Sequence, residues 1–175
     1  AGRDGFRPDR LTATIEPGHV TVLTGPNGAG KSTTLQVIAG LTRATSGRVC
    51  IGEVDVIDVD ADQWWAQLAW LPQRPVLIPG TVTENLELFG PLLDCDHACV
   101  ASGFDSVLAE LPDGPATRIG RGGIGLSLGQ RQRLGLARAL GSAAAVLLLD
   151  EPTAHIDPRS EARVLQAITA KAAPG

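Results

Sequence analysis

The residues at positions 25–33 read G-P-N-G-A-G-K-S-T, a spacing suited to holding a chain of phosphates. Its glycines let the backbone curl so that successive N–H groups point at phosphate oxygens. Lys31 would place a positive charge beside the β- and γ-phosphates, and the Ser32 hydroxyl would coordinate Mg²⁺. An ordinary glycine-rich turn between a strand and a helix is the alternative interpretation. The predicted nucleotide-binding residues are Gly25, Pro26, Asn27, Gly28, Ala29, Gly30, Lys31, Ser32 and Thr33.

A second candidate segment carries two carboxylates. Four apolar residues at 146–149 are followed by Asp150 and Glu151. Ligands of open α/β sheets collect at the carboxyl ends of the strands, so Asp150 is a candidate to hold Mg²⁺ together with Ser32. Glu151 is then a candidate general base that orients an attacking water. A strand end that carries acidic surface residues is the alternative.

A third segment, L-S-L-G-Q at 126–130, precedes a predicted helix that runs to about residue 140. Ser127 has the residue type of a helix N-cap. A helix N-terminus with a hydroxyl and a nearby glycine can also bind an anion, although a plain capping motif is the alternative. Because the chain has a single complete phosphate loop, two anion-binding ends suggest that two chains share each nucleotide.

The surrounding elements follow from hydrophobic patterning and turn residues. The apolar run at 20–23 predicts a buried strand before the phosphate loop, and 33–39 predicts the helix after it. Strands at both ends of the chain, with a helical insertion between them, predict a parallel core sheet that carries a helical subdomain. The other predicted strands are 11–15, 48–51, 54–57, 68–71 and 146–149, and the other predicted helices are 60–67, the helical segment from 81 to about 111, and one that starts at Pro158.

Composition limits the possible functions. The chain has 175 residues, 43% of them hydrophobic and 19% charged, which is typical of a globular domain. A net charge of −4 argues against a general nucleic-acid binder. Apolar runs fall short of the roughly 20 residues of a membrane helix, so any membrane attachment must come from a partner or another part of the polypeptide. Cys95 and Cys99 would share a helix face while His97 points elsewhere, which favours buried thiols over a metal site.

The order of these motifs resembles that of ABC transporter ATPase domains over nearly the whole chain. The resembling segments are the phosphate loop, Gln73, the L-S-x-G-Q stretch, the V-L-L-L-D-E strand and the run P-T-A-H-I-D at 152–157. The resemblance implies an α/β fold, with a P-loop NTPase core of mostly parallel sheet, a small antiparallel β part and an inserted helical subdomain. It also implies a single domain at 1–175, with a catalytic core at 1–72 and 141–175 and a helical signature subdomain at 73–140.

The same resemblance implies the site and its partners. Two such domains would form a head-to-tail dimer that binds ATP and Mg²⁺ at its interface. Glu151, Gln73 and Lys31 would be catalytic, and Ser32, Gln73 and Asp150 would hold the metal. The signature residues Ser127, Leu128, Gly129 and Gln130 would act on the partner's ATP, and Asp157 would lie in the D-loop that links the two sites.

Finer motifs are similar to those of exporters. The stretch Q-R-P-V-L-I-P-G-T at 73–81 and L-P-D-G at 111–114 resemble exporter ATPase domains. The amino-acid sequence around 71–75 and 152–157 most resembles that of the thiol-reductant (cysteine/glutathione) exporters linked to cytochrome bd assembly. That likeness implies fusion behind a transmembrane domain, a heterodimer, a place at the cytoplasmic face of the cell membrane and no nucleic-acid partner. Another ABC exporter (of lipid, peptide or drug) and a soluble ABC-type ATPase are the alternatives.

Several features depart from the family pattern. Leu128 stands where a second glycine is usual, and Arg121 stands where exporters often carry an acidic residue. We find no switch histidine and no adenine-stacking aromatic residue, so we expect a domain truncated at both ends, with weak or no activity in isolation. The tryptophans could form a platform for adenine or a partner, although core contacts are favoured; they are Trp64, Trp65 and Trp70.

Overall fold

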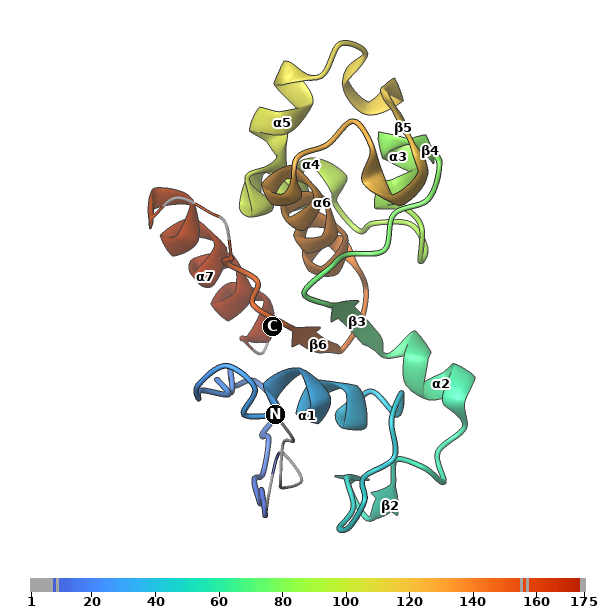
Figure 1. Ribbon diagram of the computed structural model, residues 1–175, viewed down its shortest axis with the longest axis vertical. Coiled ribbons are helices and arrows are strands. Elements are labelled where there is room, and N and C mark those ends of the chain that lie inside the picture. The colour runs from blue at the N-terminus through green and yellow to red at the C-terminus, as the bar shows by residue number, and fades with distance from the viewer. Residues whose placement is uncertain (1–7, 9, 155, 157, 174–175) are drawn as a thin grey trace, which may run out of the picture.

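Helices make up most of the regular structure in the computed structural model, which describes residues 8, 10–154, 156 and 158–173. Figure 1 shows helices α3–α6 above the β3–β6 strand pair, and α1 and α2 below or beside it. The helices are α1 (Lys31–Ile38), α2 (Ala61–Ala66), α3 (Val82–Leu86), α4 (Cys95–Ser102), α5 (Phe104–Glu110), α6 (Leu128–Gly141) and α7 (Pro158–Ala172). The strands are β1 (Cys50–Ile51), β2 (Val54–Asp55), β3 (Leu68–Leu71), β4 (Gly80–Thr81), β5 (Arg118–Ile119) and β6 (Val146–Leu149), and short 3₁₀ turns span Gly114–Ala116 and Arg121–Gly123.

The strands β3 and β6 form a parallel pair in which Leu68 lies opposite Val146 and Leu71 opposite Leu149. Both strands have the bounds that the sequence predicts. The pair packs against α6 and α7, and the core between them includes the following buried residues: Ala69, Leu71, Leu136, Ala139, Val164 and Ile168. Two short antiparallel pairs, β1–β2 and β4–β5, complete the described sheets. The predicted α/β fold is therefore confirmed.

A second core lies in the helical part, where α3, α4 and α5 pack around α6. Phe104, Val82 and Leu134 are among its fully buried side chains. The long helix α6 touches both cores, and Gly135 lets it approach the residues that follow β3. A Cβ atom there would lie 2.8 Å from Leu71 Cδ1 and 2.9 Å from Pro75 Cβ, which is closer than real contacts allow.

Capping boxes fix the starts of α3 and α6. Before α3, Thr81 Oγ1 accepts the Glu84 N–H at 3.1 Å and Glu84 Oε2 accepts the Thr81 N–H at 2.6 Å. Before α6, Ser127 and Gln130 make the same reciprocal pair, which confirms Ser127 as the predicted N-cap. Such a cap stabilises a helix by about 1 kcal/mol, so the position of the signature segment at the start of α6 is set locally.

The strands predicted at 11–15 and 20–23 are wrong. Residues 11–24 have no strand pairing, and their apolar side chains are exposed, with Ile15 at 55% and Val22 at 74%. A strand is stabilised by neighbours across and along a sheet, and in the described structure β3 and β6 pair only with each other. Alternation and β-branched residues therefore predicted strands that the tertiary structure does not pair. The predicted strands 48–51 and 54–57 exist in shorter form, as β1 and β2.

Candidate functional site

The phosphate loop has the backbone shape that its glycines predict. Gly28 and Gly30 have φ angles of 77° and 97°, in the left-handed region that glycine adopts without strain. The loop is closed by a hydrogen bond from Ala29 N–H to Pro26 O at 3.1 Å. Gly30 is the N-cap of α1 and offers no side-chain cap, so the first N–H groups of the helix stay available for an anion.

Lys31 folds back over this loop. Its ammonium donates to Gly25 O at 2.8 Å and to Pro26 O at 3.1 Å, which leaves one of its three N–H bonds for a ligand. Ser32 is exposed, whereas Thr34 Oγ1 donates to Gly30 O at 3.0 Å within the helix. Of these two hydroxyls, that of Ser32 is therefore the one open to a ligand.

The carboxylates Asp150 and Glu151 directly follow β6. Asp150 is only 5% exposed, and its N–H donates to Leu71 O at 2.8 Å, which extends the β3–β6 pairing by one residue. Glu151 is exposed and has a φ of 52°, one of two positive values among the described residues other than glycine. The chain therefore leaves the sheet in a left-handed turn that brings the carboxylate of Glu151 out to solvent.

Two glutamines hold Glu151. Gln73 Nε2 donates to Glu151 Oε2 at 3.0 Å, which joins two candidate catalytic residues that are 78 positions apart in the sequence. Gln132 Nε2 donates to the backbone oxygen of Glu151 at 3.3 Å. Gln132 was not predicted from the sequence. Its signal is a polar residue one helical turn before the buried Leu136, on a face that is otherwise apolar.

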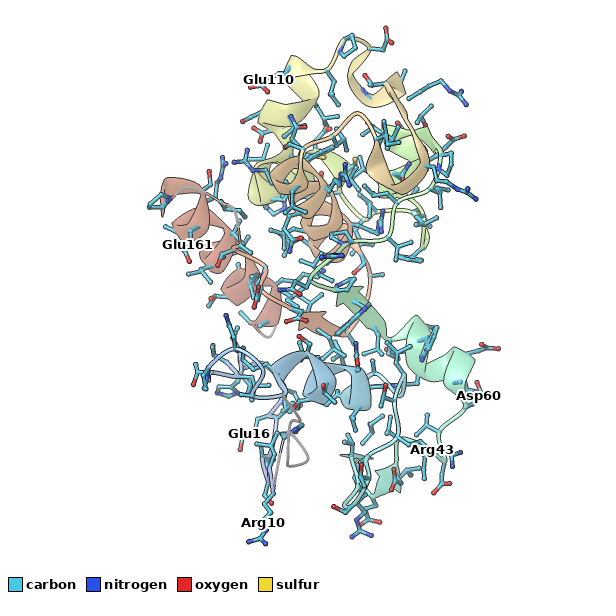
Figure 2. All side chains as sticks on the ribbon, in the orientation of Figure 1. Arg10, Glu16, Arg43, Asp60, Glu110 and Glu161 are labelled. Atoms are coloured by element: carbon cyan, nitrogen blue, oxygen red, sulfur yellow. The ribbon has the colours of Figure 1, made fainter. Side chains whose placement is uncertain are left out.

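Other candidate residues lie apart from this cluster. Ser127 and Leu128 are exposed at the start of α6, with Leu128 at 49%. The phosphate loop is not joined to β6 through the sheet, because the segment before the loop is unpaired. Asp157 lies outside the described residues. Charged side chains of both signs, such as Arg43, Asp60 and Glu110, lie at the outside of different parts of the chain (Figure 2).

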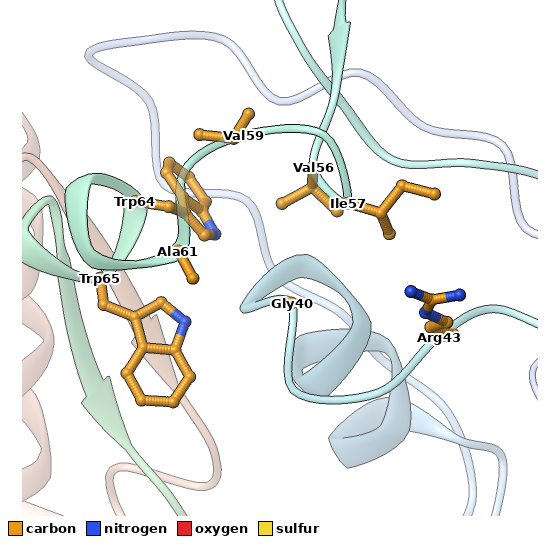
Figure 3. A pocket seen from close by; sticks show the side chains of 8 residues that line it. All are labelled: Gly40, Arg43, Val56, Ile57, Val59, Ala61, Trp64 and Trp65. Carbon is orange, nitrogen blue, oxygen red and sulfur yellow. The ribbon is translucent and has the colours of Figure 1, made fainter.

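Two of the tryptophans bind the end of α1 that is opposite the phosphate loop. Trp64 Nε1 donates to Ile38 O and Trp65 Nε1 donates to Ala39 O, each at 3.2 Å. These indoles occupy C-terminal carbonyl groups of α1 that have no partner within the helix. Beside them is a cavity of about 140 Å³, much smaller than a typical ligand pocket, which is also lined by Gly40 (Figure 3). We therefore interpret these two tryptophans as structural contacts.

Comparison with known proteins supplies the family. The family model described as ABC transporter matches residues 8–154. The chain belongs to the ABC transporter family. It is 42% identical over 169 residues to the mycobactin import ATP-binding/permease protein IrtB of Mycolicibacterium thermoresistibile, a match that covers 95% of the chain and 29% of the relative. It is 41% identical over 172 residues to IrtB of Mycobacterium tuberculosis strain H37Rv, with 97% and 30% covered.

A solved structure agrees with this assignment. The chain superimposes on the structure of a bacterial Atm1-family ABC exporter that has ATP bound. The TM-score of the superposition is 0.76 and the sequence identity is 31%, over 83% of this chain and 26% of that one. The chain spans about 30% of the length of the IrtB relatives. It is an ATP-binding ATPase domain of this family. None of the helices in the described residues is both long and apolar enough to span a membrane.

Proposed function

We propose that residues 25–33 bind the phosphates of ATP and that Glu151 orients the water that hydrolyses it. The contact between Gln73 and Glu151 carries this proposal, because it places two residues with expected catalytic roles side by side at the end of β6. The exposed carboxylate of Glu151 can accept a proton from a water, and the buried Asp150 precedes it in the chain. Lys31 and the free N–H groups of α1 would neutralise the phosphate charge.

The residue types of the proposed metal ligands suit Mg²⁺. Ser32, Gln73 and Asp150 offer a hydroxyl, an amide oxygen and a carboxylate, which are the hard oxygen ligands that this ion takes. Since Gln73 Nε2 donates to Glu151, its carbonyl oxygen is the group left to face a cation. When bound, the ion would neutralise charge on the phosphates, while Glu151 would hold the water.

We further propose that the chain works as one half of a head-to-tail heterodimer. Ser127, Leu128, Gly129 and Gln130 would then act on the partner's ATP, and Asp157 would link the two sites. A transmembrane domain fused upstream would hold the chain at the cytoplasmic face of the cell membrane, without a nucleic-acid partner. The names of the IrtB relatives, which combine ATP-binding with permease, and their greater length support this fusion. We also propose a catalytic core at 1–72 and 141–175 and a helical subdomain at 73–140; the core built from residues between Leu77 and Ala137 supports the helical subdomain.

Two cargo classes follow from different observations. The segments around 71–75 and 152–157 favour cysteine or glutathione export. The mycobactin import relatives instead favour a siderophore, and they match 95% or more of the chain. Uptake of labelled glutathione and of a labelled iron–siderophore by inverted and right-side-out vesicles would separate the two. ATP-dependent movement of only one cargo selects that class.

Replacing Lys31 by alanine tests the nucleotide site. We expect Mg·ATP affinity to fall at least about tenfold, since the variant loses the positive charge that the loop holds. The measurement is isothermal titration calorimetry on the intact polypeptide. Lys171, the only other lysine in the sequence, provides the matched control as Lys171→Met. Unchanged affinity in Lys31→Ala would overturn the assignment. In Glu151→Gln, binding should persist while turnover falls to a small residual rate.

A further inference from the structure

Gln132 is a buried amide in the helix that carries the signature segment. It is 2% exposed and lies one turn into α6, with the apolar residues Leu136 and Ala139 further along the same face. Burial of an amide among apolar groups is unfavourable unless its N–H and C=O groups are bonded. The contact that Gln132 makes with Glu151 is therefore the feature that needs explanation.

That contact fixes an unusual backbone. Glu151 has a φ of 52°, a conformation that costs a residue with a side chain about 1–2 kcal/mol. Its carbonyl oxygen accepts Gln132 Nε2–H at 3.3 Å and Ala154 N–H at 3.0 Å. The two donors hold the peptide that follows Glu151. They thereby oppose rotation of the residue out of its left-handed conformation.

The direction of the Glu151 side chain depends on this backbone, because the Cα–Cβ bond turns with φ and ψ. The carboxylate end is held separately, by Gln73 Nε2 at 3.0 Å. Glu151 is thus bonded at its backbone from α6 and at its side chain from the loop after β3. Neither bond alone would fix both the position and the direction of the carboxylate.

We propose that Gln132 is a positioning residue for Glu151, through which α6 sets the direction of the carboxylate that orients water. The inference rests on the proposed function of Glu151. Because α6 is a continuous helix from Leu128 to Gly141, a shift at its signature end moves Gln132 and the Glu151 peptide together. Contact of the signature segment with a partner's nucleotide would in this way act on the hydrolytic site of the same chain.

The test is Gln132→Met in the full-length transporter that contains this domain. Methionine keeps the length of the side chain and removes the donor. We expect kcat for ATP to fall about 10- to 100-fold, as misplaced catalytic groups cause, while the KM for ATP stays within about twofold. Gln166→Met, at an exposed position of α7, is the matched control and should leave both constants unchanged. An unchanged kcat in Gln132→Met would overturn the proposal.

A double variant separates positioning from structural damage. In a Glu151→Gln background, Gln132→Met should not lower the residual turnover further, because no catalytic carboxylate is left to misplace. An equal loss in both backgrounds would refute the positioning role. If Glu151→Gln itself turns over ATP like wild type, the proposed function fails instead, which is a distinct outcome.

Gln132→Glu provides a second readout that does not require a neutral apolar substitute. The ionised carboxylate cannot donate to Glu151 O, whereas the protonated acid can, and burial raises the pKa of such a group. The ratio of variant to wild-type kcat should therefore rise as pH falls. A ratio that does not change with pH would count against a role for the donated hydrogen bond.

Discussion

Replacing Arg138 by methionine tests how strongly the contacts of α6 with the segment that follows Gln73 in the sequence, and with α3, stabilise the fold. Arg138 is 7% exposed, and its guanidinium donates from Nε and Nη2 to Asn85 O at 3.0 and 2.6 Å. Its Nη1 donates to Val76 O at 3.1 Å, and its Cζ lies 5.0 Å from the centre of the Phe89 ring. Arg138 thus bonds both the segment that follows Gln73 and the end of α3.

The expected loss can be estimated from these contacts. Methionine leaves the buried Asn85 carbonyl without its two donors, at a cost of about 1–3 kcal/mol, and removes a cation–π contact of about 0.5–1 kcal/mol. The partly buried Val76 carbonyl can bind water instead. Burial lowers the pKa of Arg138 to about 10, so the charge is present at neutral pH at some desolvation cost, and its removal offsets part of the loss. We expect a net destabilisation of about 2–3 kcal/mol, or a melting temperature about 5–10 °C lower.

Urea unfolding followed by circular dichroism measures this difference directly. Arg121→Met, at an exposed position before the signature segment, is the control and should stay within about 0.5 kcal/mol of wild type. A loss below that value in Arg138→Met would show that the carbonyl contacts do not stabilise the helical part. The reasoning from buried unpaired carbonyls would then be wrong.

Two further predictions concern thiols and acid stability. Burial, with the neighbouring Cys95 thiol as a second cause, raises the pKa of Cys99 to about 12, so Cys99 stays protonated at pH 7–9. Iodoacetamide should therefore label the exposed Cys50 and Cys95 first, as measured by mass spectrometry. Rapid labelling of Cys99 would contradict its burial. Hydrogen bonds from the Thr81 backbone N–H and hydroxyl lower the pKa of Glu84 in the folded protein. The ionised carboxylate therefore stabilises the fold at pH values above the pKa that Glu84 has in the unfolded chain. This contribution is lost as the pH falls through the pKa of Glu84 in the folded protein. Melting curves of wild type and Glu84→Gln should therefore differ at neutral pH and converge in acid, and a constant difference would contradict this.

The sequence predicted best those elements whose signals are local. The strand 68–71 is a short apolar run between Gln67 and Pro72, and the strand 146–149 is a run of bulky apolar residues between three alanines and Asp150; both appear with the predicted bounds. Ser127 is an N-cap because its partner Gln130 lies three residues away. Hydrophobic pattern failed at 11–15 and 20–23, since pairing there depends on other strands rather than on the segment itself.

In the candidate site, too, features set by local sequence could be predicted, whereas features set by contacts between distant segments could not. The shape of the phosphate loop follows from its own glycines and could be predicted. The contact between Gln73 and Glu151 depends on how β3 and β6 pair, and the sequence implied it only through the family resemblance. Gln132 was missed because its role arises from a contact with a residue 19 positions away, which its position on a helix does not reveal. The short pair β4–β5 was missed because Arg118 and Ile119 lie in a glycine-rich stretch that predicts a loop.

The capping box at the start of α6 has a consequence for encounter with a second chain. Ser127 Oγ accepts the Gln130 N–H at 3.3 Å, and Gln130 Oε1 accepts the Ser127 N–H at 2.8 Å, so both rotamers are set within the folded monomer. Because the oxygen of Ser127 serves as acceptor, its own hydrogen remains free to turn towards an incoming anion. Immobilising a side chain on association usually costs about 0.5–1.5 kcal/mol in entropy. In the proposed dimer that ordering would precede docking, so the surface offered to the other subunit would be preorganised before the two chains meet.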